Sequence, residues 1–88
     1  MSLEVEIRAP TAEESATAAK WPIWTKEESE FDWSYSQIEQ CLILEGEVDI
    51  VADSKKWSFK AGDYVVFPKG LKCKWIVKKA VKKHYNFI

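Results

Sequence analysis

Two side chains of this sequence, Glu39 and Tyr35, are of types that can move a proton in a binding site. A carboxyl group among aromatic rings can act as a general acid or base, because burial raises its pKa. Tyr35, four residues away, carries a phenol whose ordinary pKa is about 10. We therefore take Glu39 and Tyr35 as the candidate catalytic residues.

Five further residues are candidates for ligand binding: Trp33, Cys41, Cys73, Trp75 and His84. The tryptophan rings offer apolar walls that suit a flat or a cationic ligand. The cysteines offer thiols, and His84, the only histidine, has an unperturbed pKa near neutrality. Its closing strand, KKHYNF, allows a position in the interior beside the acid, while alternation equally allows one at the surface or at an interface.

The first thirty residues predict a short strand and a short helix. Val5 and Ile7 alternate with charged residues before a proline, which indicates a strand. Thr11 and Glu14 are spaced as a capping box, which predicts about two helical turns over TAEESATAAK. Pro22 indicates that this helix has ended.

The rest of the chain predicts antiparallel strands. They are expected at 30–35, 64–67, 72–78 and 82–87, with a hairpin inside 39–51 that turns at Glu45-Gly46 and further turns at 53–55 and 61–63. The lysine-rich segment 78–83 is expected to be a solvated hairpin. Turns every eight to twelve residues predict a sandwich or a barrel rather than parallel βαβ units.

Length and charge limit the classes of protein. With 88 residues the chain can build one core, so we expect a single domain over residues 1–88. A formal net charge of −1 provides no field for nucleic acid or an anionic membrane. No apolar run reaches the ~20 residues of a membrane span, and MSLEVEIRAP lacks the features of a secretory signal. Two cysteines without a framework favour free thiols and the cytoplasm, although a trimmed organelle-targeting peptide fits as well.

Two stretches resemble the two sequence motifs of the cupin superfamily. In EFDWSYSQIEQCLILEG, Glu39 and Gly46 stand at the family's glutamate and glycine, while Trp33 and Tyr35 stand at its two histidines. In GDYVVFPKG followed by LKCKW, the glycine and proline positions are kept, but Cys73 replaces the third histidine. Nearly the whole chain is similar to a subgroup of small bacterial and plant cupins of unknown function, related to the cupin domains of ureidoglycine aminohydrolase and of the ethanolamine-utilisation cupin.

The resemblance implies an all-β fold, a small antiparallel β-barrel or jelly roll of the RmlC-like type with one short N-terminal helix. It also implies a metal site of three histidines and a glutamate, of which only Glu39 is kept. An indole has no lone pair for a cation, and a phenol has to lose its proton first. We therefore expect no metal, and keep a divalent cation at Glu39 and Cys73, helped by Cys41 or His84, as the alternative.

Strand parity predicts a shared pocket. If Glu39 points inward, so do Cys41 and Ile43. The neighbouring strands are expected to contribute Trp33, Tyr35, Cys73 and Trp75. The favoured function is the binding of a small molecule in this aromatic pocket. The alternatives are a divergent metal-dependent, aminohydrolase-like enzyme and a non-catalytic homodimer that pairs through the first strand and the segment of Trp21 and Trp24. The rings can equally fill a closed core, with the acid bonded to a phenol or an indole.

Overall fold

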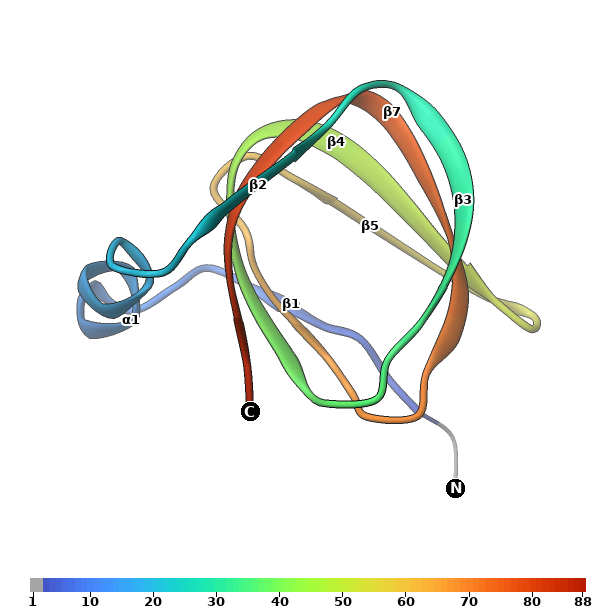
Figure 1. Ribbon diagram of the computed structural model, residues 1–88, viewed down its shortest axis with the longest axis horizontal. Coiled ribbons are helices and arrows are strands. Elements are labelled where there is room, and N and C mark those ends of the chain that lie inside the picture. The colour runs from blue at the N-terminus through green and yellow to red at the C-terminus, as the bar shows by residue number, and fades with distance from the viewer. Residues whose placement is uncertain (1–2) are drawn as a thin grey trace.

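Two long antiparallel strands, β4 (Glu39–Ala52) and β7 (Lys72–Phe87), form the centre of the fold in the computed structural model, which describes residues 3–88. Positions 1 and 2 of the expected domain lie outside the described residues. Figure 1 shows both strands bending as they run side by side, so that the sheet curves around a common interior. Each long strand therefore contributes to two parts of the curved sheet.

The shorter strands are β1 (Glu6–Arg8), β2 (Ile23–Lys26), β3 (Ser29–Ser34), β5 (Lys55–Lys60) and β6 (Tyr64–Phe67). The first half of β4 and the second half of β7 lie in the order β1-β6-β4-β7-β2. Beyond the bend, β5 pairs with the second half of β4 and β3 pairs with the first half of β7. All pairs are antiparallel, and the expected small all-β fold is confirmed.

The expected hairpin turn at Glu45-Gly46 is wrong, because β4 continues through it. Gly46 has a φ of 100° and lies where the register between β4 and β7 shifts. A Cβ at Gly46 would come within 2.4 Å of the Ala80 carbonyl oxygen. Glycine is therefore required here by a β-bulge and by the close approach of the β7 backbone, and not by a turn. The expected break between strands 72–78 and 82–87 is wrong for the same reason, since β7 runs through the bulge.

The predicted helix is confirmed as α1 (Ala12–Ala18), which lies outside the ring of strands in Figure 1. The Thr11 hydroxyl accepts from the Glu14 backbone N–H, and the Glu14 carboxylate accepts from the Thr11 N–H. Arg8 of β1 donates two hydrogen bonds of 2.6 Å to the same carboxylate, which ties the helix to the first strand. Within the described residues, no helix has the length and apolar character needed to cross a bilayer.

The core lies inside the curved sheet. Its largest fully buried side chains are Trp75, Phe67, Ile43, Ile50, Val48, Val65, Val81 and Cys41. The inward parity of Glu39, Cys41 and Ile43 is confirmed, since each is at most 4% exposed. Rings occupy much of the interior, and Phe67 stacks on Tyr35 with centroids 4.8 Å apart. This interior is not closed on all sides, because a cavity lined mainly by rings opens to the surface.

Candidate functional site

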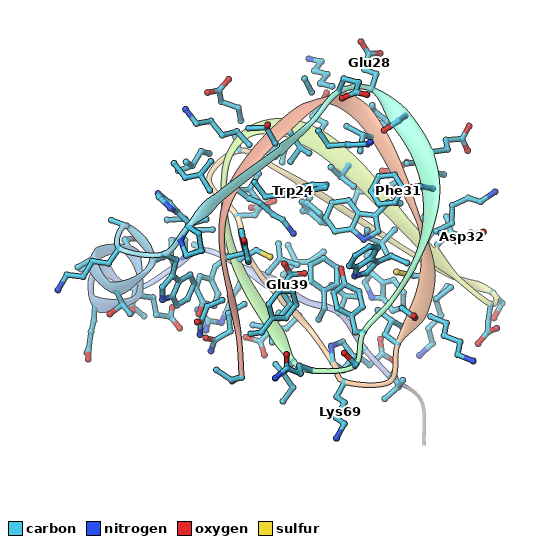
Figure 2. All side chains as sticks on the ribbon, viewed as in Figure 1. Trp24, Glu28, Phe31, Asp32, Glu39 and Lys69 are labelled. Atoms are coloured by element: carbon cyan, nitrogen blue, oxygen red, sulfur yellow. The ribbon has the colours of Figure 1, made fainter. Side chains whose placement is uncertain are left out.

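A cavity of about 220 Å³ opens into the interior of the curved sheet. It is lined by Trp24, Phe31, Trp33, Tyr35, Glu39, Trp75, Lys83, Tyr85 and Phe87. Figure 2 shows Trp24, Phe31 and Glu39 inside the ring of strands, whereas Glu28 and Lys69 point outward. Seven of the nine lining residues are aromatic, so the site is an apolar space with one acid and one amine. We call it the aromatic pocket.

The two expected catalytic residues enter the pocket from the connection that follows β3 and from the start of β4. Tyr35 follows β3, and its backbone is held on both sides, since its N–H donates to the Leu71 carbonyl and its carbonyl accepts from the Gly70 N–H. Glu39 is the first residue of β4 and pairs with Phe67 and Phe87 on the flanking strands. Backbone hydrogen bonds therefore fix the positions from which both side chains point inward.

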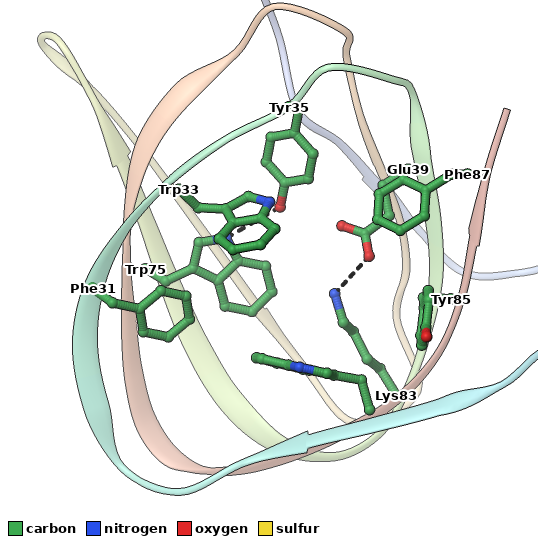
Figure 3. Close-up of a pocket in the computed structure, with 9 residues that line it drawn as sticks. Phe31, Trp33, Tyr35, Glu39, Trp75, Lys83, Tyr85 and Phe87 are labelled. Atoms are coloured by element: carbon green, nitrogen blue, oxygen red, sulfur yellow. Dashed lines mark hydrogen bonds and ion pairs between the residues drawn. The ribbon is translucent and has the colours of Figure 1, made fainter.

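The acid of the pocket is paired with a buried lysine. The Lys83 ammonium donates a hydrogen bond of 2.9 Å to Glu39 Oε2, and each of the two side chains is only 5% exposed (Figure 3). A charge removed from water is tolerated when it is paired and hydrogen-bonded. Lys83 was expected in a solvated hairpin, so this expectation is wrong. The continuous strand β7 turns Lys83 inward, between Val81 and Tyr85.

Aromatic rings surround the ammonium of Lys83. Its Nζ lies 4.7 Å from the Trp75 ring centroid and 5.0 Å from that of Trp24. It also lies 3.4 Å from the sulfur of Cys41, which is fully buried. The faces of the rings attract a cation electrostatically. The place that a cationic ligand would take among these rings is therefore already held by a side chain of the protein.

Tyr35 and Trp75 form a second polar contact at the wall of the pocket. The Trp75 indole N–H donates to the Tyr35 hydroxyl at 3.1 Å, and both residues are buried. Burial, followed by the nearby carboxylate of Glu39, raises the pKa of the Tyr35 phenol well above its ordinary value. Tyr35 is therefore a neutral phenol throughout the physiological range and can offer its proton as a hydrogen-bond donor.

The two cysteines do not line the aromatic pocket. Cys41 lies in the core, where burial raises the pKa of its thiol. Cys73 lines a second surface depression together with Trp33, Lys72 and Lys74. Burial, and then the carboxylates nearby, raise the pKa of the Cys73 thiol to about 11. Both thiols are therefore protonated at neutral pH, unlike reactive cysteines, whose pKa is lowered.

His84 lies outside the pocket as well. It follows Lys83 on β7, so alternation turns it to the other face of the strand, where its Nδ1 lies 2.9 Å from the Trp21 carbonyl oxygen. The expectation that His84 contacts a ligand in the pocket is therefore not supported by its position. Its contact joins β7 to the segment that precedes β2.

Sequence reasoning missed five residues of the pocket: Trp24, Phe31, Lys83, Tyr85 and Phe87. A usable signal was present for four of them. Phe31 alternates at period two with Trp33 and Tyr35, and the last three alternate in the same way after Val81. Reading that alternation without a break at 79–81 would have placed Lys83 on the inner face. For Trp24 the sequence carries no sign that β2 pairs with β7 rather than with its neighbour β3.

The donors present do not fit the metal site that the fold suggests. Within residues 3–88, no three His, Cys, Asp or Glu side chains are grouped so that they could hold a metal ion. Trp33 and Tyr35 provide an indole and a neutral phenol, and the carboxylate of Glu39 already carries an ammonium. The positive charge next to Glu39 is therefore supplied by the side chain of Lys83 and not by a metal ion.

Solved structures share this fold. A DUF861 family protein from Thermotoga maritima is 50% identical, with a TM-score of 0.91 over 97% of this chain and 100% of that chain. The EutQ protein of Clostridium difficile is 26% identical, with a TM-score of 0.69 over 98% of this chain and 68% of that one. A putative ethanolamine utilization protein Q from Salmonella typhimurium is 21% identical and has a TM-score of 0.67 over 94% and 68% of the two chains, which supports the fold alone.

The curved antiparallel sheet with an interior pocket is therefore a cupin fold. Residues 13–85 match the family model of the EutQ-like cupin domain, and the chain belongs to this family. Among curated proteins there is no match to this chain. Since a shared fold does not establish a shared reaction, the function has to be argued from the aromatic pocket.

Proposed function

We propose that this cupin binds a small, flat organic molecule in the aromatic pocket, with Glu39 and Lys83 as its polar contacts. The observation that carries the proposal is a buried ion pair at the wall of an open, ring-lined cavity. Small-molecule sites are typically apolar clefts with a few convergent polar groups. At about 220 Å³ the cavity is below the roughly 300–1,000 Å³ that is typical of ligand pockets, so the ligand is the size of one ring with short substituents.

The charges of the pocket narrow the class of ligand. A cation would meet the ammonium of Lys83, which already lies over the rings of Trp24 and Trp75. The rings therefore favour a flat ligand but no longer favour a cationic one. A neutral or weakly anionic ligand can accept a hydrogen bond from Lys83 or from the phenol of Tyr35, and can stack against the half-exposed ring of Trp33 at the mouth.

Saturation-transfer NMR with benzyl alcohol, benzoate and benzylamine tests this function. Signal transfer to benzyl alcohol and benzoate is expected, with a weaker signal for benzylamine, which brings a second ammonium. Trp33→Ala should weaken binding roughly 2- to 12-fold, since a ring contact is worth about 0.5–1.5 kcal/mol. Trp21→Ala removes the same side chain outside the pocket and should leave binding unchanged. Absence of transfer to all three compounds would refute the proposal.

The expected homodimer is a separate proposal. The strand order ends at β1 and β2, which have three and four residues, so each of these strands has, within the described residues, a short edge without a partner strand. An unpaired strand edge is a template for a second copy of the chain. The mass in solution at micromolar concentration tests the dimer, and a monomeric mass speaks against it. Trp24 lines the aromatic pocket, so the dimer surface is better sought along β1.

A further inference from the structure

Lys83 differs from every other lysine of the chain in its surroundings. Among residues 3–88 it is the only buried lysine, at 4% exposed, and it still lines an open cavity. Figure 3 shows its amine at the end of an extended side chain, between Glu39 and the ring of Trp75. An amine held in an apolar cavity has few water molecules to remove before it reacts, and lysines in such sites form Schiff bases with carbonyl compounds.

We propose that the amine of Lys83 forms an imine with a carbonyl group of the ligand, so that the pocket takes a flat aldehyde or ketone. This inference rests on the function proposed for the aromatic pocket and names the class of its ligand. The nitrogen lone pair attacks the carbonyl carbon and forms a C–N bond, while the carbonyl oxygen takes up a proton. The resulting carbinolamine loses one water molecule, and no electrons are gained or lost overall.

Glu39 is placed to move the protons that these steps require. The ammonium has to give up a proton before its nitrogen can attack, and Oε2 of Glu39 lies 2.9 Å away along an existing hydrogen bond. The same carboxyl group can return the proton to the hydroxyl that leaves as water. The Tyr35 phenol, kept neutral by burial, adds a donor from the neighbouring wall of the pocket. Glu39 and Tyr35 thus keep the acid–base roles that their residue types suggest.

The chemistry of the pocket selects a carbonyl compound over other flat ligands. An aldehyde or a ketone is uncharged, so it can enter beside the ammonium without an unpaired charge being buried. Its oxygen can accept hydrogen bonds from Lys83 and Tyr35, while its ring packs against Phe31 and Trp75. A carboxylate ligand would satisfy the ammonium as well, but it would compete with Glu39 for the same proton donor.

Trapping the imine tests the inference on the wild-type chain. The protein is incubated at neutral pH with benzaldehyde and sodium cyanoborohydride, which reduces an imine to a stable benzyl amine, and the labelled lysines are located by peptide mapping. Labelling of Lys83 is expected to be at least about tenfold faster than labelling of Lys82, its partly exposed neighbour. Labelling of Lys83 at or below the rate of Lys82 overturns the inference.

Two variants define the roles of the pair. Lys83→Arg keeps a cation for Glu39 but has no amine, so the rapid label should disappear, whereas Lys82→Arg should leave it in place. Glu39→Gln should slow labelling of Lys83 roughly 100-fold, the low end of the effect of a positioned acid–base group. Benzyl alcohol, which has the same ring without a carbonyl, separates the two proposals. If it binds while Lys83 is not trapped, only the imine is refuted; if it does not bind and Lys83 is not trapped, both proposals fail.

Discussion

Lys83 and Glu39 form a buried ion pair across β4 and β7, with Nζ and Oε2 2.9 Å apart and both side chains 5% exposed. The two residues are 44 positions apart in the sequence. The first half of β4 and the second half of β7 are paired, and this pairing places Glu39 and Lys83 close together. The contact lies at the wall of the aromatic pocket, so the same pair joins two strands of the fold and places two charged groups in the site.

Breaking this pair on one side should destabilise the protein more than removing both charges. We expect Lys83→Met and Glu39→Leu each to lower the free energy of unfolding by about 3–5 kcal/mol, because each leaves a buried charge without its partner. The double variant should lose much less than the sum of the two. Urea unfolding of the four proteins as a double-mutant cycle measures the coupling.

Lys82 and Glu45 provide the matched control for that cycle. Their charged atoms are 3.8 Å apart, and the side chains are 42% and 67% exposed. Solvent screens such a pair, so Lys82→Met and Glu45→Leu should couple by less than about 1 kcal/mol. Equal coupling energies in the two cycles would contradict the view that burial makes the Lys83–Glu39 pair strong.

The sequence predicts the fold well because most of its information is local. Thr11 and Glu14 predict the helix through the capping box, and alternation places Glu39 and Cys41 inside. The site is harder to predict, because two signals compete at its second charged residue, Lys83: its alternation with Val81 and Tyr85 predicts the inner face, and its charged neighbours predict solvent. The charge-rich segment around Lys83 is typical of a solvated turn, and the pairing of β4 with β7 along this segment shows that the alternation was the correct signal.

The predicted hairpin turn at Gly46 is wrong because a positive φ occurs in two different kinds of backbone structure. A positive φ favours glycine in a tight turn and equally in a bulge of a continuous strand. The two cases differ in what lies nearby, and the sequence does not contain that information. At Gly46 the nearest atoms belong to the backbone of Lys79, Ala80 and Val81 on β7.

Gly46→Ala is therefore expected to be much more destabilising than Gly62→Ala. Both glycines have a φ near 100°, so both substitutions strain the backbone by about 1 kcal/mol or more. At Gly46 the new Cβ would also lie 2.4 Å from the Ala80 carbonyl oxygen, whereas nothing lies within 4 Å at Gly62. Thermal unfolding measures the difference, and similar losses for both variants would show that the strand bend does not depend on this contact.

Tyr35→Phe should destabilise the wall of the pocket. The substitution removes the hydroxyl group that accepts the hydrogen bond of the Trp75 indole. It leaves a buried N–H without a partner. An unsatisfied buried donor costs about 1–3 kcal/mol. Tyr85→Phe removes a partly buried hydroxyl from the same pocket and should cost less than about 0.5 kcal/mol. Urea unfolding compares the two variants, and an equal loss would argue against the Tyr35–Trp75 bond.

Cys73 should react with iodoacetamide slowly and with an unusual dependence on pH. The reactive species is the thiolate, and a pKa of about 11 instead of 9.0 leaves about 100-fold less of it at pH 8. The rate should therefore keep rising beyond pH 9, where the rate of an ordinary thiol levels off. Cys41→Ser leaves Cys73 as the only thiol and allows the rate to be followed by mass spectrometry.

Trp33→Ala should bring Cys73 closer to an ordinary thiol. Trp33 on β3 is the register partner of Cys73 on β7, and both line the same surface depression. Since burial is the largest cause of the raised pKa, removing the ring should lower the pKa and speed alkylation at pH 8, with little change at pH 11. Trp21→Ala removes a ring elsewhere and should leave the rate unchanged. A wild-type rate that already levels off near pH 9 would show that water reaches the thiol, and that Trp33 does not cover it.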